Sequence, residues 1–284
     1  SEMQNGTLKA NQIDLGAVVA VAAALPLPEA DRVRLRNWMP AGVLTSLEAR
    51  WQGLEQADRR FSLRSQFTGL GWLPLEYVPG ANGLTGSVDA TQAGGSIAID
   101  SAKSALIFPK VFAETLRFDT LSAQASWQRE GAQTVVKIQN VGFANADVAG
   151  SVFGTYKSAP PPLADQPVAK RAPGWIDLSG KIVRGRGERV GRYLPLVLGP
   201  RVRAWLDHAI ESGRGKDATL TLKGDLYHFP FADDQNGIFD FRAQVEDVKL
   251  WYANDWPKIE HVKATLHFRG ARLEIVGDGS IFGA

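Results

Sequence analysis

The main pattern along the chain is a strict alternation of apolar and polar residues in short runs, separated by glycine-rich or Asn/Asp turns. It is clearest at residues 219–224, 239–252, 261–270 and 272–276. A period of two places one set of side chains on each face of a strand, so each run predicts a strand with an apolar and a polar face. The same pattern in the first half predicts further strands at residues 44–53, 60–67, 83–90, 95–100, 121–128 and 134–143.

Two segments have helical periodicity instead. Residues 200–212 begin with a proline, carry an apolar stripe at helical spacing and stop before Gly213. Residues 28–39 repeat this arrangement, and the tryptophans of the two segments, Trp38 and Trp205, are expected to pack each helix onto the sheet.

Two such helices are too short to cover more than ten strands. Either the sheet folds upon itself, or it leaves an apolar channel open. The fold class predicted is mainly β: a long, curled antiparallel sheet, trough-like, with a hydrophobic inner face and a few short helices.

The order of these elements recurs along the chain. The phrase RLRNW at residues 34–38 returns as RVRAW at 201–205, and FSLRSQF at 61–67 aligns with residues 239–245 at an offset of 178. Gly53 falls on Gly224 at a smaller offset of 171. An internal duplication is the economical explanation, and the sheet is expected to contain two related repeats.

The two repeats define the expected domain organisation. The first β-rich repeat is expected at residues 1–157 and the second at 174–284, with a proline-rich linker or loop at 158–173. The second repeat stops where the first continues for roughly fifty more residues, so it is expected to be truncated, and the chain a fragment of a longer, repetitive protein.

Composition narrows the function classes. The formal net charge of +2 over 284 residues gives no general affinity for nucleic acid, and the absence of cysteine excludes disulfides and thiolate metal sites. The longest apolar stretch, residues 17–25, is too short to cross a bilayer and lacks the basic segment of a signal peptide. Any membrane anchor is expected to lie outside this sequence.

Catalytic motifs are absent. The four histidines show no zinc-binding spacing, residues 185–191 depart from a dinucleotide-binding loop, residues 232–237 lack the later glutamate of a calcium loop, and no G-x-S-x-G motif occurs. The protein is therefore expected not to be an enzyme and to have no cofactor and no metal.

One local cluster of cations lies between residues 181 and 203. This segment contains seven basic residues and one acidic residue, and the local excess of positive charge can bind phosphates. The alternative is an ordinary solvated loop and helix face. The expected phosphate contacts are Arg184, Arg186, Arg201 and Arg203.

Several phrases together resemble a known family. YLP at 193–195, WLDHAIESG at 205–213, LKGDLYHFPF at 222–231 and DWPKIEHVKATLHFRGARLEI at 255–275 are similar to the YhdP branch of the AsmA-like envelope proteins, as is LPLP…W…PAGVLTSLEARWQG in the first half. The resemblance implies a periplasmic location in a Gram-negative bacterium, with the parent protein anchored in the inner membrane. It also implies a β-sheet groove that carries phospholipids towards the outer membrane, with possible partner proteins at either membrane.

The apolar positions of the strands are the candidates for lining such a groove, with closed core as the alternative for each. They are Leu47, Leu63, Phe67, Leu220, Leu222, Phe241, Val245, Leu250, Leu266, Phe268 and Leu273. A different class of function, a scaffold that pairs its strand edges with client polypeptides, is the competing hypothesis.

Overall fold

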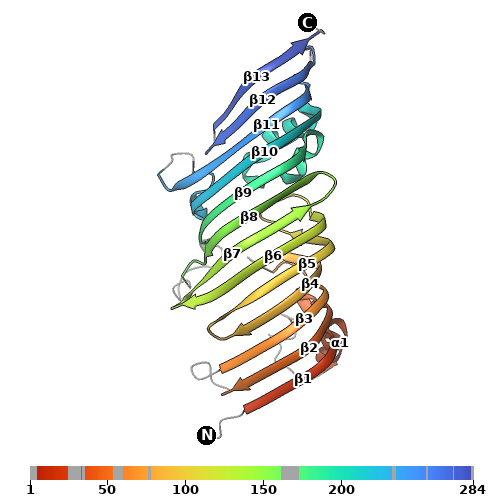
Figure 1. The fold of residues 1–284 in the computed structure, drawn as a ribbon, viewed down its shortest axis with the longest axis vertical. Helices are drawn as coiled ribbons and strands as arrows, with labels where there is room; N and C mark the ends of the chain where they lie inside the picture. Colours follow the sequence, from red (N-terminus) through yellow and green to blue (C-terminus); the bar gives the residue numbers. More distant parts are fainter. Residues whose placement is uncertain are drawn as a thin grey trace.

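The computed structural model describes residues 5–24, 33, 36–53, 60–75, 78–160, 173–231, 235–253, 255–270 and 272–282. It is one antiparallel sheet of thirteen strands, and each strand pairs only with its neighbours in sequence (Figure 1). The strands are β1 (Asn5–Asp14), β2 (Ala41–Gln52), β3 (Arg60–Trp72), β4 (Gly80–Thr91), β5 (Gly94–Ile107), β6 (Leu116–Glu130), β7 (Gln133–Ala144), β8 (Val148–Lys157), β9 (Trp175–Arg186), β10 (Ile210–Asp225), β11 (Gly237–Leu250), β12 (Ile259–Arg269) and β13 (Arg272–Ile281).

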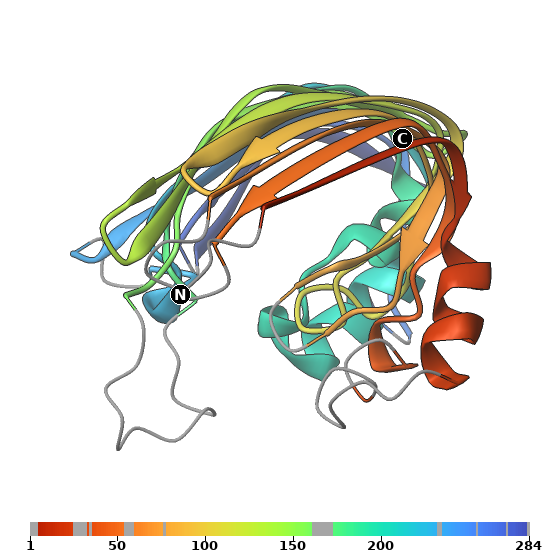
Figure 2. The same ribbon diagram turned by 90° about the horizontal axis from the view of Figure 1, so that it is seen from below.

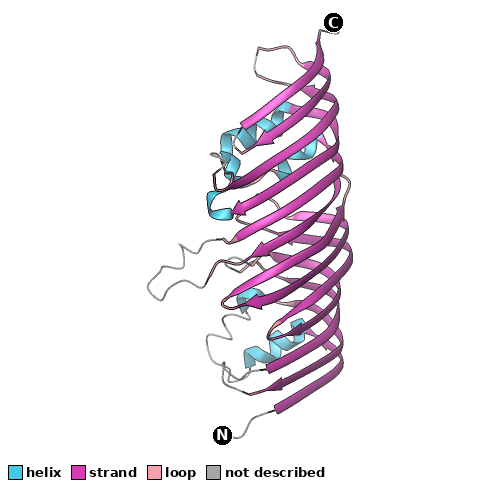
Figure 3. Cartoon of the chain, turned by 60° about the vertical axis from the view of Figure 1, so that its left-hand side comes forward, coloured by secondary structure: helices cyan, strands magenta, loops and turns pink. Residues whose placement is uncertain are grey.

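The sheet is a single layer that curls into an arch when viewed along its long axis (Figure 2). The described helices lie beneath the arch, and none of them covers its outside (Figures 2 and 3). This confirms the prediction of a mainly β, curled antiparallel sheet with few short helices. The helices are α1 (Leu15–Ala24), η2 (Gly187–Tyr193), η3 (Leu196–Leu198), α3 (Gly199–Ala209) and η4 (Leu226–His228).

The meander gives the trough two different rims. Connections that follow odd-numbered strands leave the sheet at one edge of the arch, which we call the helical rim because α1, η2, η3 and α3 belong to it. The loops after β3, β5, β7 and β11 lie on the same rim. Connections that follow even-numbered strands form the opposite, turn rim.

The predicted helix at 200–212 is present but shorter. Helix α3 has its proline in the first turn and ends at Ala209. Residues 210–212 instead begin β10, because Ile210 and Ser212 pair with Leu250 and Lys249 of β11. Most of the predicted helix at 28–39 lies outside the described residues, although Val33 and residues 36–38 are helical. Helix α1 was not predicted.

The expected linker at 158–173 also lies largely outside the described residues. The sheet itself continues across this position, since Lys157 of β8 pairs with Trp175 of β9. The two halves of the chain therefore share one uninterrupted sheet.

The backbone has unusual conformations at corresponding places in the two halves. Positive φ angles occur at Gly42, Ser46 and Gly53, and again 171 residues later at Gly213, Asp217 and Gly224. They occur at Gly69 and Gly83, and again 178 residues later at Asp247 and His261. These offsets are those of the sequence alignment. The duplication stays a prediction, and these correspondences favour it.

Candidate groove for apolar ligands

A row of apolar residues crosses the whole sheet on one face. Paired Cα positions in neighbouring strands share a face, so the register can be followed from β1 to β13. The row contains one residue from each strand and no polar side chain. In strand order it is Ile13, Leu44, Phe67, Gly86, Ile99, Ala123, Val141, Val152, Gly180, Leu220, Phe241, Phe268 and Leu273.

Two further rows extend this apolar surface towards the turn rim. One runs from Val88 on β4 to Phe239 on β11, and the other from Leu8 on β1 to Gly237 on β11. Neither contains a charged residue; the first comprises Val88, Ile97, Ala125, Ile138, Gly154, Leu178, Leu222 and Phe239, and the second Leu8, Ala49, Leu63, Ala90, Gly95, Trp127, Val136, Tyr156, Ile176, Gly224 and Gly237.

Standard strand spacings give the size of the surface. Thirteen strands about 4.8 Å apart make it roughly 58 Å long, and four residues between the outer rows make it roughly 13 Å wide. We call this strip the apolar groove. Its polar exception, Tyr156, donates its hydroxyl hydrogen bond to the carbonyl oxygen of Pro173, and burial raises the pKa of this phenol.

The apolar groove is on the concave face of the arch. Phe67 in the row is only 1% exposed, and the helices lie beneath the arch whereas its outer side is open to solvent (Figure 2). The intervening side chains on the outer face form cross-strand ion pairs, including Arg64–Asp89, Lys216–Glu246 and Lys249–Glu260. The sheet therefore separates an apolar interior from a charged exterior.

A buried cluster closes the groove beside the helical rim. It consists of Phe67, Ala81, Leu84, Phe118 and Leu121. The three rows away from this corner are mostly half-buried, which is unusual for apolar side chains in such numbers. The closed core on this side is thus continuous with a half-buried apolar strip, and Val88, Ile97 and Ile99 of the strip pack against the core.

Comparison with known proteins gives a match to one family. The model of the YhdP family, described as YhdP protein, matches residues 1–283. The chain belongs to the YhdP family. No curated protein and no solved structure matches it.

Membership in the YhdP family places the chain among bacterial envelope proteins. In the described residues, no helix is long and apolar enough to cross a membrane. The same residues contain no group of three or more metal-ligating side chains.

The structure brings most of the expected groove residues of this YhdP-family chain together on one face. Phe67, Leu220, Phe241, Phe268 and Leu273 belong to the row that crosses the sheet. Leu63 and Leu222 belong to the neighbouring rows. Leu266 lies two residues before Phe268 in β12 and therefore on the same face. Val245 shares that face with Phe241, and Leu250 lies beyond a register shift, paired with Ile259.

Exposure distinguishes these residues. Leu47 and Phe67 are fully buried, so their side chains belong to the closed part of the trough. Leu273, at the edge strand, is 40% exposed, and the other eight are half-buried. Lipid contact by any of them stays a prediction.

Sequence reasoning missed the middle of the groove. Ile97, Ile99, Val141, Val152 and Leu178 line it on β5, β7, β8 and β9. The alternation at β5 and β7 was recognised, but no residue there was chosen. On β8 and β9 the signal is weak because Gly154 and Gly180 occupy positions where an apolar side chain is expected.

The four arginines expected to contact phosphate fall into two pairs. Arg184 donates to the carbonyl oxygens of Asn145 and Ala146 at 2.6 and 2.7 Å, and Arg186 pairs with Glu188 at 2.6 Å. In the described part of the chain, Arg201 and Arg203 on α3 form neither a hydrogen bond nor an ion pair. Phosphate contact by any of the four stays a prediction.

Neighbouring arginines fasten η2 to the sheet. Arg192 pairs with Asp147 at 3.1 Å and with Glu114 at 3.6 Å, and Asn145 donates to the Tyr193 hydroxyl at 2.9 Å. Burial raises the pKa of Tyr193. This part of the cation cluster has a structural role on the helical rim.

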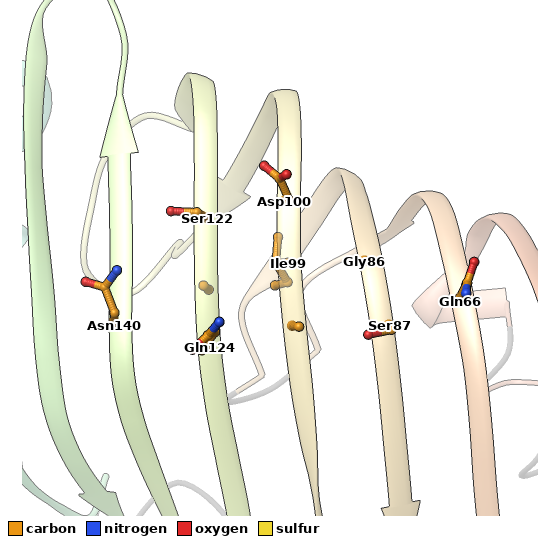
Figure 4. A pocket seen from close by; sticks show the side chains of 10 residues that line it. Gln66, Gly86, Ser87, Ile99, Asp100, Ser122, Gln124 and Asn140 are labelled. Carbon is orange, nitrogen blue, oxygen red and sulfur yellow. The ribbon is translucent and has the colours of Figure 1, made fainter.

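A shallow hollow on the outer face has a mixed polar and apolar lining. Gln66, Ser87, Gln124 and Asn140 line it from four strands, with Asp100 and Ser122 beside them (Figure 4). Each of these residues alternates with a residue of the inner face, as Gln66 does with Phe67, so the hollow lies across the sheet from the apolar groove. Gly86, Ala98, Ile99 and Ala123 complete its lining, which is therefore mixed and not continuously apolar.

Proposed function

We propose that this YhdP-family chain is a periplasmic lipid-transfer segment that shields phospholipid acyl chains during movement between the inner and outer membranes. The observation that carries the proposal is the row of thirteen apolar residues across the sheet. An acyl chain gains about 0.8 kcal/mol for each CH₂ removed from water. A strip without a charged residue offers that gain along its whole length.

The dimensions of the groove suit this role. An acyl chain in one leaflet spans about 15 Å, half of a bilayer core of about 30 Å, so the strip is about four chain lengths long. A polar headgroup can stay in water at the open side of the trough. The lipid then moves between many similar weak sites, and it does not have to escape from a single deep site.

The chemistry proposed is binding and not catalysis. The groove offers side chains that exclude water and no titratable group inside its rows apart from Tyr156. The partners we propose are phospholipids, with proteins of either membrane in contact with the longer parent.

Native mass spectrometry of the chain purified from bacterial cells tests this function. We expect bound phospholipid, and we expect Leu220→Asp to remove most of it because the carboxylate would be buried among apolar neighbours. Thr219→Asp is the matched control, since the adjacent side chain is exposed on the outer face. Circular dichroism melts check that both variants fold.

Two results would contradict the proposal. One is a lipid-free wild-type protein that also fails to bind a fluorescent phospholipid. The other is equal lipid content in the Leu220→Asp and Thr219→Asp variants.

The edges of the sheet favour a second candidate function, a scaffold that pairs with client strands. In the described sheet β1 and β13 each have one partner strand, and β13 exposes Ile275 and Val276. An exposed apolar edge can accept another strand. In that case Leu220→Asp would leave client binding intact, whereas a proline placed in β13 would abolish it.

A further inference from the structure

Exposed aromatic side chains gather at the helical rim beside α3. Trp205 is 39% exposed, Tyr252 52% and Trp256 59%. Their rings contact one another in series, with centroids 6.1 Å apart for Trp205 and Tyr252 and 5.8 Å apart for Tyr252 and Trp256. The Trp205 indole donates to the carbonyl oxygen of Tyr252. We call these three residues the aromatic lip. Trp205 links α3 to the segment after β11, and it remains 39% exposed while doing so.

A similar arrangement occurs near the other end of the same rim. The Trp38 and Trp72 rings lie 6.3 Å apart, and Met39 and Val78 beside them are exposed. Corresponding backbone bonds fix the two sites: Leu73 donates to the carbonyl of Trp38, and Trp251 to the carbonyl of Ala209, both at 2.8 Å. Helix α1 adds exposed Val18 and Val21 to the rim.

Cations accompany the aromatic lip. Arg201 precedes Trp205 by four residues and so lies on the same face of α3, with exposed Val202 beside it. Arg203, which follows Val202 in α3, is half-buried. Asp207 and Asp255 are near residues of the aromatic lip in the chain, and their carboxylates offset part of the positive charge. The aromatic rings are therefore expected to contribute more to binding at this surface than the arginines.

We propose that the helical rim docks on the surface of a phospholipid bilayer. Tryptophan and tyrosine favour the boundary between headgroups and acyl chains, because an apolar ring and a polar tip are both satisfied there. Arginine adds attraction to anionic headgroups. Both aromatic sites belong to connections on the helical rim. Helices α1 and α3 of this rim lie beneath the same side of the arch (Figure 2), so one membrane plane can contact both sites.

Docking at this rim would bring the membrane to the side of the groove that the buried cluster closes. It uses residues outside the groove, so the inference is independent of whether the groove carries lipid. Variants of the two surfaces therefore separate the two proposals.

Flotation of the 284-residue chain with lipid vesicles tests the docking surface. We expect binding to phosphatidylcholine vesicles that contain a minority of phosphatidylglycerol, and weaker binding to pure phosphatidylcholine. Arg201→Glu should weaken binding about fivefold or more, and raised salt should reduce the difference. Trp256→Ser, which changes the most exposed ring of the lip, should weaken it at least as much.

Matched controls change the same properties elsewhere. Arg50→Glu reverses a charge on the outer face of β2, and Tyr227→Ser removes an exposed ring from the turn rim. Both should bind vesicles like the wild type. Leu220→Asp should also float with vesicles, even if it loses its groove lipid.

Three outcomes would overturn the inference. The wild-type chain fails to float with either vesicle, or Arg201→Glu and Trp256→Ser float as well as their controls. The third is a dimer in light scattering that these two variants convert to a monomer, which would make the rim an interface between copies.

Discussion

Several strand residues have a backbone conformation that suits glycine better than any other residue. Gly69 in β3 has φ of +65°, and Asp247, the corresponding residue of β11, has φ of +53°. A Cβ atom added to Gly69 would meet no atom within 4 Å. The cost of a side chain at this position is therefore conformational and not steric.

Gly69→Ala is expected to lower the free energy of unfolding by about 1 kcal/mol, because the left-handed region disfavours a Cβ atom. Gly185→Ala is the control, since Gly185 has an ordinary φ and its added Cβ would make one contact at 4.0 Å. Urea unfolding followed by circular dichroism measures both. Equal losses of stability in the two variants would show that the conformation of residue 69 is not the cause.

At the same scale, the sequence predicts the face of a residue better than its burial. Alternation placed Phe67 and Phe241 correctly on the inner face. Phe67 is nevertheless closed off by a cluster that includes Leu84 and Phe118, whereas Phe241 stays half-buried. Residues distant in sequence supply that cover, and the pattern around each phenylalanine does not contain them.

The strands of the C-terminal half are joined on the outer face by ion pairs. Lys216 donates a hydrogen bond that lowers the pKa of Glu246, and Lys249 does the same for Glu260. For Asp240, burial opposes the change, but the hydrogen bond and charge of His267 together with Arg242 lower its pKa. These pairs connect β10, β11 and β12.

A lowered carboxyl pKa in the folded state contributes stability above its ordinary value, and this contribution is lost as pH falls. For Glu246 and Glu260 that ordinary value is 4.5, and for Asp240 it is 3.8. We therefore expect the Tm to be nearly constant near neutral pH and to fall below about pH 4.5.

Thermal melts across this range measure the effect. The double variant Glu246→Gln, Glu260→Gln should show a smaller fall of Tm with acid than the wild type. Glu274→Gln, which changes a carboxylate without an ion pair among the described residues, should not. An unchanged acid dependence in the double variant would contradict this assignment.

Elements with strong periodicity could be predicted from the sequence and those with weak periodicity could not. The strands β2 to β7 and β10 to β13 each contain a predicted run. The strand β8 contains Gly150 and Gly154, and in β1 the apolar residues Ala10 and Ile13 are three positions apart, so alternation is hard to recognise in both. Their strand conformation depends on pairing with neighbours, as with Gly154 and Leu178.

Among the described residues, each strand hydrogen-bonds only to the strands next to it in sequence, and the buried cluster and the helical rim add side-chain contacts beyond these pairs. The order of the strands in the sheet is that of the chain. At the helical rim, Asn145 donates a hydrogen bond to Tyr193 of η2, and Leu196 of η3 donates one to the carbonyl oxygen of Val111. Such a linear arrangement is expected to open locally from its ends, without a single cooperative transition.

Hydrogen exchange followed by mass spectrometry tests this behaviour. Amides of β1, β12 and β13 should exchange before those of β5 and β6, which lie beside the buried cluster around Phe118 and Leu121. A uniform exchange rate in all strands would instead indicate one cooperative unit.

The strict strand order also determines how such a protein can change in length. Adding one hairpin inserts two strands, lengthens the groove by roughly 10 Å and leaves every existing pair of strands with the same partner except at the point of insertion. The number of hairpins thus determines the length of the groove. Selection for a longer or shorter groove could act on gene length by whole hairpins, with no redesign of the existing strand pairs.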